Sequence, residues 1–243
     1  MTSSLIHPAE CLYESGSLSD GSGMSLRPGG SQLTARAVFC GNWHPGERVI
    51  DIGCGRGETL DYLRRCGLDA IGVDVSNTVL CQAKLENDDL FVIQASGDNL
   101  PFANNSVDGV IAECSLSLIQ KASEALIEFH RVLRPGGRLV ITDLYARAPQ
   151  PAGDIDDSPP SCFSGILGKD RTIQQLERVG FDLDSWEDHS DVLKTFITRF
   201  IFEHGSLDAL WSGSTTGEKA EDRMRSVTSL RPGYAILVAR KGR

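Results

Sequence analysis

Between residues 48 and 143, short apolar runs alternate regularly with amphipathic helical stretches. The apolar runs contain few polar residues, as in VIDIG and GVIAE, which is typical of strands buried on both faces. Strands are predicted over 48–52, 70–75, 90–94, 107–112 and 138–143, and helices over 31–40, 59–66, 78–86 and 123–133. This alternation predicts an α/β fold with a mostly parallel sheet and helices on both faces.

Weaker signals continue beyond residue 143. Pro and Asp are frequent at 146–161 and predict an exposed loop, and Thr172 with Gln175 forms a capping-box pattern that predicts a helix start. The remaining elements are a helix over 172–179, a strand over 181–186, a helical apolar stripe over 192–201 and a last strand over 234–239. The expected fold is therefore Rossmann-like, with a doubly wound sheet of seven strands.

A length of 243 residues allows one large domain or two small ones. The Ser- and Gly-rich beginning predicts a flexible N-terminal flap over 1–26, followed by a single domain over 27–243. Within that domain we expect a lid-like loop at about 146–170 and a helical insertion at about 190–225.

The composition argues against several classes of partner. Lys and Arg number 24 against 33 Asp and Glu, which gives a formal net charge of −9 and disfavours binding to nucleic acids or anionic membranes. No apolar run approaches the roughly 20 residues that span a bilayer, and no secretory signal is visible, so a cytoplasmic location is expected. The seven cysteines include no CxxC pair, which predicts reduced thiols and no structural metal. The oligomeric state stays open.

The first predicted strand runs into a glycine-rich turn. Asp51 precedes Gly53, Gly55 and Gly57, and a helix follows. Alternating glycines let a ligand approach the backbone closely. A dinucleotide fingerprint would place a third glycine where Glu58 stands, and the Asp51 carboxylate would repel a pyrophosphate. The pattern therefore favours a cationic, adenosine-bearing ligand such as S-adenosylmethionine over NAD.

A second acid lies at the end of the second predicted strand. Asp74 follows Asp51 by 23 residues, where a carboxylate can accept hydrogen bonds from both ribose hydroxyls. The alternative interpretation of the two acids is local capping of a helix or turn. Their joint spacing favours the ligand-binding interpretation.

With these features, the sequence resembles the class I S-adenosylmethionine-dependent methyltransferases of the type 11 group. The resemblance rests on several motifs, namely VIDIGCGRGETL at 49–60, AIGVDVS at 70–76, LPF at 100–102, SVDGVIAECSLSL at 106–118 and RVLRPGGRLVITD at 131–143. It covers residues 27–145 strongly and the last predicted strand more weakly. It implies a methyltransferase with S-adenosylmethionine as its cofactor.

The resemblance also implies roles for individual residues. Asp51, Gly53, Cys54 and Gly55 would line the methionine end of the cofactor, and Asp74 would bind its ribose.

The adenine would contact Val75, and Ser96, Gly97 and Asp98 would cover its edge. Relatives commonly have an acid where Ser96 stands, so either Asp98 or a backbone amide alone would make that contact here.

Methyl transfer is an in-line displacement in which positioning and desolvation supply much of the catalysis, and no catalytic dyad is visible. The candidate catalytic residues are Glu113, Cys114 and Tyr145. By the resemblance, Glu113 would face the methionine end of the cofactor or the substrate, and Tyr145 follows the fifth strand, where substrate-facing residues often lie. Arg27 would reach the cofactor carboxylate or an anionic substrate if the N-terminal flap closed; the alternative is a solvated arginine.

The segment IAECSLSL at 111–118 is similar to the strand-four motif of arsenite methyltransferases, in which a cysteine at the position of Cys114 binds trivalent arsenic. Soft thiolates suit such a centre, and Cys40, Cys54 and Cys162 are the candidates for further thiols. The alternative is that these cysteines pack as small hydrophobes.

Methylation of a small molecule is the preferred function. The alternatives are an arsenite-type methyltransferase that uses Cys114 and a non-catalytic module that binds S-adenosylmethionine.

Overall fold

A computed structural model describes residues 27–148, 166–205 and 227–242. Seven strands form one sheet in the order β3-β2-β1-β4-β5-β7-β6. They are β1 (Arg48–Ile52), β2 (Asp69–Asp74), β3 (Val92–Gln94), β4 (Val107–Glu113), β5 (Leu133–Ala146), β6 (Phe181–Asp188) and β7 (Pro232–Lys241). β7 is antiparallel to β5 and β6, and the other pairs are parallel. The Rossmann-like, mostly parallel seven-stranded sheet predicted from the sequence is confirmed.

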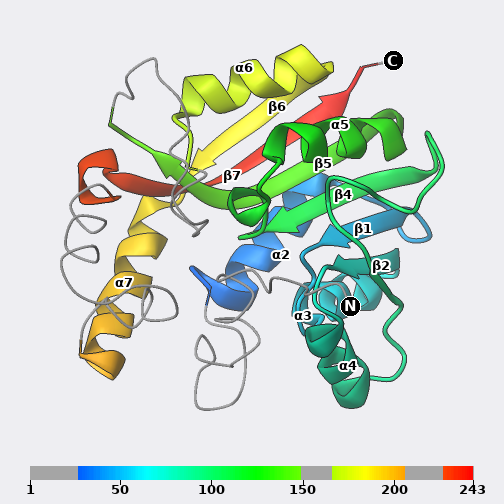
Figure 1. Cartoon of the computed structure of the whole chain (residues 1–243), viewed down its shortest axis with the longest axis horizontal. Helices are drawn as coiled ribbons and strands as arrows, with labels where there is room; N and C mark the ends of the chain where they lie inside the picture. Colours follow the sequence, from blue (N-terminus) through cyan, green and yellow to red (C-terminus); the bar gives the residue numbers. More distant parts are fainter. Residues whose placement is uncertain (1–26, 149–165, 206–226, 243) are drawn as a thin grey trace, which may run out of the picture.

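Helices cover both faces of this sheet (Figure 1). They are α2 (Gly30–Gly41), α3 (Glu58–Arg65), α4 (Asn77–Glu86), α5 (Ala122–Val132), α6 (Lys169–Val179) and α7 (Ser190–His204), with a short 3-10 helix η1 (Leu116–Leu118). α5 and α6 lie on one face, and α2, α3, α4 and α7 lie on the other. Alternate strand residues divide between two cores accordingly: Ile50 and Ile141 pack with α5, whereas Val49 and Val140 pack with α2 and α3.

The order of the strands reverses at β1. β2 and β3 extend the sheet on one side of β1, and β4 begins the other side. Ligands of open α/β sheets bind at such a switch point, outside the carboxyl ends of the strands. Asp51 lies near the carboxyl end of β1, and Glu113 ends β4. The topology therefore brings these two acids, distant in sequence, together at the switch point, where the ligand crevice of such sheets lies.

The LRPGG segment at 133–137 differs from its prediction. The sequence places a turn at Pro135-Gly136-Gly137 before the fifth strand, but β5 already begins at Leu133. Leu133 pairs with Val107, and the register shifts between Val107 and Gly109 to accommodate the extra residues. Lys241 Nζ donates to the carbonyl of Leu133 at 2.8 Å. Residues 134–137 have no partner in β4, and Gly136 has a positive φ of +81°. The predicted turn is therefore present as an irregularity inside β5, and only the start of the strand differs from the prediction.

The capping box predicted at Thr172 is wrong. α6 begins at Lys169 after Gly168, with no side-chain cap. The Thr172 hydroxyl instead donates to the Gly168 carbonyl at 3.2 Å, which is a contact within the first turn. The helix therefore begins one turn earlier than the pattern predicts.

Several sequence predictions lie outside the described residues. These are the N-terminal flap over 1–26, positions 149–165 of the lid-like loop with Cys162, and the helical insertion beyond residue 205. The part of the insertion that is described forms α7. None of the helices in the described ranges combines the length and the apolar character needed to cross a bilayer.

Candidate active site

The glycine turn between β1 and α3 has one open position. Gly53, Gly55 and Gly57 all have positive φ, at +69°, +53° and +86°, a region that disfavours other residues. A Cβ at Gly53 would lie 2.6 Å from Ser115 Cβ, and one at Gly57 would lie 2.5 Å from Leu90 Cδ1. A Cβ at Gly55 would meet no described atom within 4 Å. The turn thus packs tightly on both sides and leaves room at its centre.

Asp74 lies beside this opening with its carboxylate held by backbone amides. The amide of Gly55 donates to Oδ2 and that of Ser76 donates to Oδ1, each at 2.9 Å. Ser76 in turn caps α4, because its hydroxyl accepts from the amide of Val79 at 3.2 Å. The carboxylate is therefore fixed between the glycine turn and the start of α4.

Asp51 is buried at the carboxyl end of β1, with 1% of the residue exposed. Its Oδ2 atom has no hydrogen-bond partner among the described residues. Burial raises the pKa of Asp51 to about 8, and the charges of Glu113 and Asp74 add to this effect. A cation arriving at this carboxyl group would relieve both its desolvation and its missing hydrogen bond.

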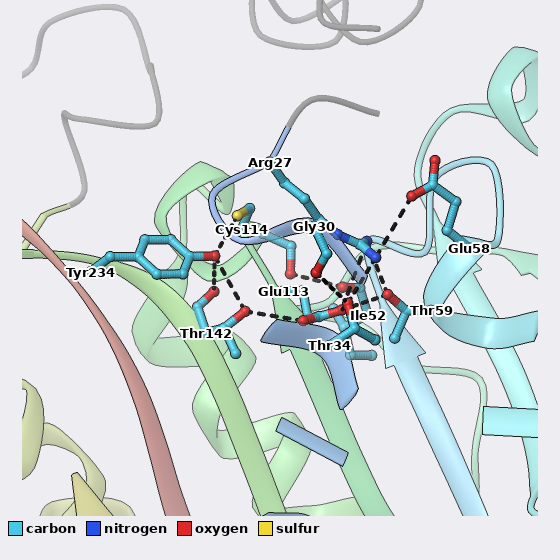
Figure 2. A network of polar contacts seen from close by, with 11 residues as sticks. Arg27, Gly30, Thr34, Ile52, Glu58, Thr59, Glu113, Cys114, Thr142 and Tyr234 are labelled. Atoms are coloured by element: carbon cyan, nitrogen blue, oxygen red, sulfur yellow. Dashed lines mark hydrogen bonds and ion pairs between the residues drawn. The ribbon is translucent and has the colours of Figure 1, made fainter. Parts of the chain in front are cut away.

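Glu113 is surrounded by threonine hydroxyls (Figure 2). Its Oε2 accepts from Thr34 of α2 at 3.1 Å and from Thr59 of α3, and its Oε1 accepts from Thr142 of β5 at 3.4 Å. The guanidinium of Arg27 lies 3.7 Å from Oε2. This carboxylate therefore links four parts of the chain at the crevice.

The alternative interpretation of Arg27 as a solvated arginine disagrees with the structure, in which its side chain is 16% exposed. The three threonines around Glu113 were not predicted from the sequence. Their only signal is position: Thr59 follows Glu58 at the start of α3, and Thr142 precedes Asp143 within β5.

The residues predicted to face adenine lie at the other end of the crevice. Val75, after β2, is 44% exposed. The hydroxyl of Ser96 donates to the carboxylate of Asp98, and Gly97 is packed so closely that a Cβ would lie 2.7 Å from Ile119 Cδ1. Ser96 therefore orients Asp98.

Cys114 follows β4 with an unusual backbone conformation. Its φ is +51°, a strained value for a residue with a side chain. Its Sγ lies 2.7 Å from the hydroxyl of the buried Tyr234. Burial raises the pKa of the Cys114 thiol, and the charge of Asp143 adds to the effect. The resting group is thus a thiol rather than a thiolate.

The other described cysteines do not join Cys114. Cys54 is buried beside Gly72, and the Cys40 thiol donates to Glu187 at 3.5 Å. Each therefore has separate partners, as packed or surface thiols do. The described ranges contain no group of three His, Cys, Asp or Glu side chains placed to hold a metal ion.

Tyr145 is separated from Glu113 and Cys114. Its ring packs edge-to-face on Trp186 of β6, with centroids 5.1 Å apart, and Trp186 belongs to the core that α5 and α6 cover. Glu113 and Cys114 contact the side of the sheet on which α2 lies. The structure thus brings two of the three catalytic candidates together.

Comparisons with known proteins agree with this geometry. Residues 50–141 match the model of a methyltransferase domain. An uncharacterized methyltransferase of Synechocystis sp. is 29% identical over 168 residues, which are 68% of this chain and 75% of that protein. An arsenite methyltransferase of Halobacterium salinarum is 32% identical over 68% of this chain, but the match spans only 44% of that longer protein.

Solved structures share the fold of this chain. The [4+2]-cyclase SpnF has a TM-score of 0.69 with 27% identity, over 87% of this chain and 80% of its own. Haemonchus contortus phosphoethanolamine N-methyltransferase 2, solved with S-adenosyl-L-methionine, has a TM-score of 0.71 with 18% identity, over 97% of this chain and 57% of its own. With its fold, its glycine turn and its strand-end acids, the chain belongs to the class I S-adenosylmethionine-dependent methyltransferases.

Proposed function

We propose that this enzyme transfers the methyl group of S-adenosylmethionine to a small molecule, at the crevice outside β1, β2 and β4. The observation that carries the placement is the Asp74 carboxylate, held at 2.9 Å by the amides of Gly55 and Ser76 beside an open glycine turn. A carboxylate fixed in this way is ready to accept hydrogen bonds from two ribose hydroxyls.

The other residues of the crevice fit the same cofactor. Asp51, with its unpartnered buried Oδ2, would face the ammonium of the methionine end. At the opposite end, Val75 and the Ser96–Asp98 pair would face adenine, with Asp98 supplying the acid that relatives commonly carry two positions earlier. The Asp51 carboxylate facing the ammonium at one end and the Asp98 carboxylate facing adenine at the other would fix the direction of the bound cofactor.

The bound cofactor supplies a methyl carbon activated by a sulfonium. The chain's contribution is to position the acceptor and exclude water. Glu113 is poorly placed to act as a base on the acceptor, because three threonine hydroxyls already donate hydrogen bonds to its oxygens. Its role in this proposal is to hold α2, α3 and β5 together around the reacting end.

A small-molecule acceptor agrees with the names of several relatives. These include demethylmenaquinone methyltransferases of Renibacterium salmoninarum and Beutenbergia cavernae, and an O-methyltransferase of Aspergillus sclerotiorum. The net charge of −9 disfavours a nucleic-acid acceptor, because binding to the phosphate backbone needs a cationic face.

The test is transfer of a radiolabelled methyl group from S-adenosylmethionine into fractionated cell extract. We expect label in the small-molecule fraction and none in the protein or nucleic-acid fractions. Cofactor binding by calorimetry without label in any fraction would support the non-catalytic alternative. Label in macromolecules would contradict the small-molecule acceptor. Because the similar SpnF is described as a cyclase, the transferred methyl group itself must be measured.

A second candidate acceptor is trivalent arsenic. The strained φ of Cys114 and the arsenite methyltransferase among the relatives favour it. Methylated arsenic should form with the wild type and with Cys66→Ser, which changes an exposed thiol, but not with Cys114→Ser. Equal activity in all three proteins would remove Cys114 from the reaction.

A further inference from the structure

Arg27 reaches into the crevice from the start of the described chain (Figure 2). Pro28, Gly29 and Gly30 turn the chain here, with φ of +77° at Gly29 and +48° at Gly30. The turn folds the arginine back over the first turn of α2, where its Nη2 donates to Thr34 Oγ1 at 2.8 Å. Nη1 donates to Thr59 Oγ1 at 3.0 Å. The guanidinium therefore bridges α2 and α3 at the switch point of the sheet.

The ionic contacts of this guanidinium are incomplete. Its nearest carboxylate oxygens, on Glu58 and Glu113, lie 3.6 and 3.7 Å away, beyond the usual range of a charge-assisted hydrogen bond. Its Nε is buried and has no hydrogen-bond partner among the described residues. Arginine normally satisfies a carboxylate through two parallel hydrogen bonds.

Arg36, on α2, shows a fully paired guanidinium. Its Nε and Nη2 donate to the two oxygens of Glu187 at 3.0 and 2.6 Å. That pair lies at the surface, with 45% of the Arg36 side chain exposed. The more buried Arg27 is therefore the less completely paired, which reverses the pattern expected of a purely structural arginine.

An unpartnered atom of opposite charge lies in the same crevice. Asp51 Oδ2 is buried without a hydrogen bond in the described part of the chain, and the Arg27 charge is close enough to favour the ionised form of Asp51. A buried donor on a cation and a buried acceptor on an acid together match one zwitterion, an α-amino acid group with its carboxylate toward Arg27 and its ammonium toward Asp51.

We propose that Arg27 is the ligand of the cofactor's carboxylate and that it selects S-adenosyl ligands that keep this group. The inference rests on the cofactor placement proposed above. Glu113 and Glu58 hold the guanidinium loosely in place, and the two threonine hydroxyls orient it. The backbone carbonyl of Arg27 accepts from the Gly30 amide at 3.3 Å, which holds Arg27 against the start of α2.

The test compares two ligands that differ only in the carboxylate. These are S-adenosylhomocysteine and its decarboxylated analogue, in which a hydrogen replaces the carboxylate. Titration calorimetry measures the binding of both to the wild type, to Arg27→Gln and to Arg36→Gln. Arg27→Gln should bind S-adenosylhomocysteine about tenfold more weakly or worse, yet bind the decarboxylated analogue within about twofold of the wild type. Arg36→Gln should bind both ligands like the wild type.

An equal loss for both ligands in Arg27→Gln would reduce Arg27 to a structural role and overturn the proposal, as would no loss for either. If Arg27→Gln fails to fold, Arg27→Lys keeps the charge but loses the paired donors, and it should show the same ligand-dependent loss to a smaller degree. A wild type that binds neither ligand would instead contradict the cofactor placement itself.

Discussion

Asp51 is a buried acid whose pKa lies well above its ordinary value. Its carboxyl group lies under α3, accepts one backbone hydrogen bond from Leu60, and has a pKa of about 8 because burial disfavours its charge. Near neutral pH the carboxyl group is therefore largely protonated before ligand arrives. A bound ammonium would favour the carboxylate, so binding and deprotonation are coupled.

This coupling predicts that ligand binding releases a proton from Asp51. At pH 7, binding of S-adenosylhomocysteine should release a proton from Asp51, since the pKa falls in the complex. Calorimetry in two buffers of different ionisation enthalpy measures this release, which should be smaller in Asp51→Asn. Identical proton release in the two proteins would show that Asp51 does not face the ligand's cation.

Glu113 provides a second prediction at this scale. Glu113→Gln removes the negative charge beside the buried Arg27 and an acceptor of threonine hydroxyls, so the free energy of unfolding should fall by about 1–3 kcal/mol. Glu187→Gln, in a more exposed pair with Arg36, should cost less than about 1 kcal/mol. Urea denaturation compares the two variants, and a larger loss for Glu187→Gln would contradict the role given to Glu113.

At the scale of elements, the glycine turn both packs against the fold and leaves space for a ligand, and substitutions can separate these two roles. Gly57 packs against Leu90, whereas Gly55 faces open space. Gly57→Ala should therefore destabilise the fold by clearly more than the roughly 1 kcal/mol that a left-handed conformation alone costs. Gly55→Ala should lose little beyond that amount but should bind S-adenosylhomocysteine poorly, because its methyl group enters the ligand space. Thermal unfolding and calorimetry measure both properties; the opposite ranking would place the ligand elsewhere.

The elements that sequence reasoning predicted well are those with a strong local cause. The alternation from residue 48 to 143 predicts the strands and helices around the switch point, and the glycines and acids predict Asp51, Gly55 and Asp74 at one crevice. The start of β5 and the start of α6 differ from their predictions because backbone partners decided the outcome there, namely Val107 opposite Leu133 and Gly168 in the first turn of α6.

Parts of the site depend on contacts that no local pattern records. Thr34, Thr59 and Thr142 lie on α2, α3 and β5, and only the folded sheet brings their hydroxyls to Glu113. Tyr145 could not be separated from Glu113 by sequence either, since the face on which a residue near a strand end lies depends on its register and neighbours.

For the whole molecule, part of the net negative charge is concentrated at one site. A net charge of −9 excludes little by itself, but Asp51, Asp74 and Glu113 concentrate acids around a crevice that contains Arg27 as a nearby cation. Such a crevice suits a ligand with an ammonium, a sulfonium and a ribose. The fold places these groups at the switch point, and membership of the family identifies the cofactor as S-adenosylmethionine.

The most direct measurement of the central claim is the affinity for S-adenosylhomocysteine of two aspartate variants on one strand. Asp74 ends β2 beside the glycine turn, and Asp69 begins it, in a surface ion pair with Arg48. Asp74→Ala should bind about tenfold more weakly or worse, and Asp69→Ala should bind like the wild type. Unchanged affinity in a folded Asp74→Ala protein would contradict the placement of the cofactor at this crevice.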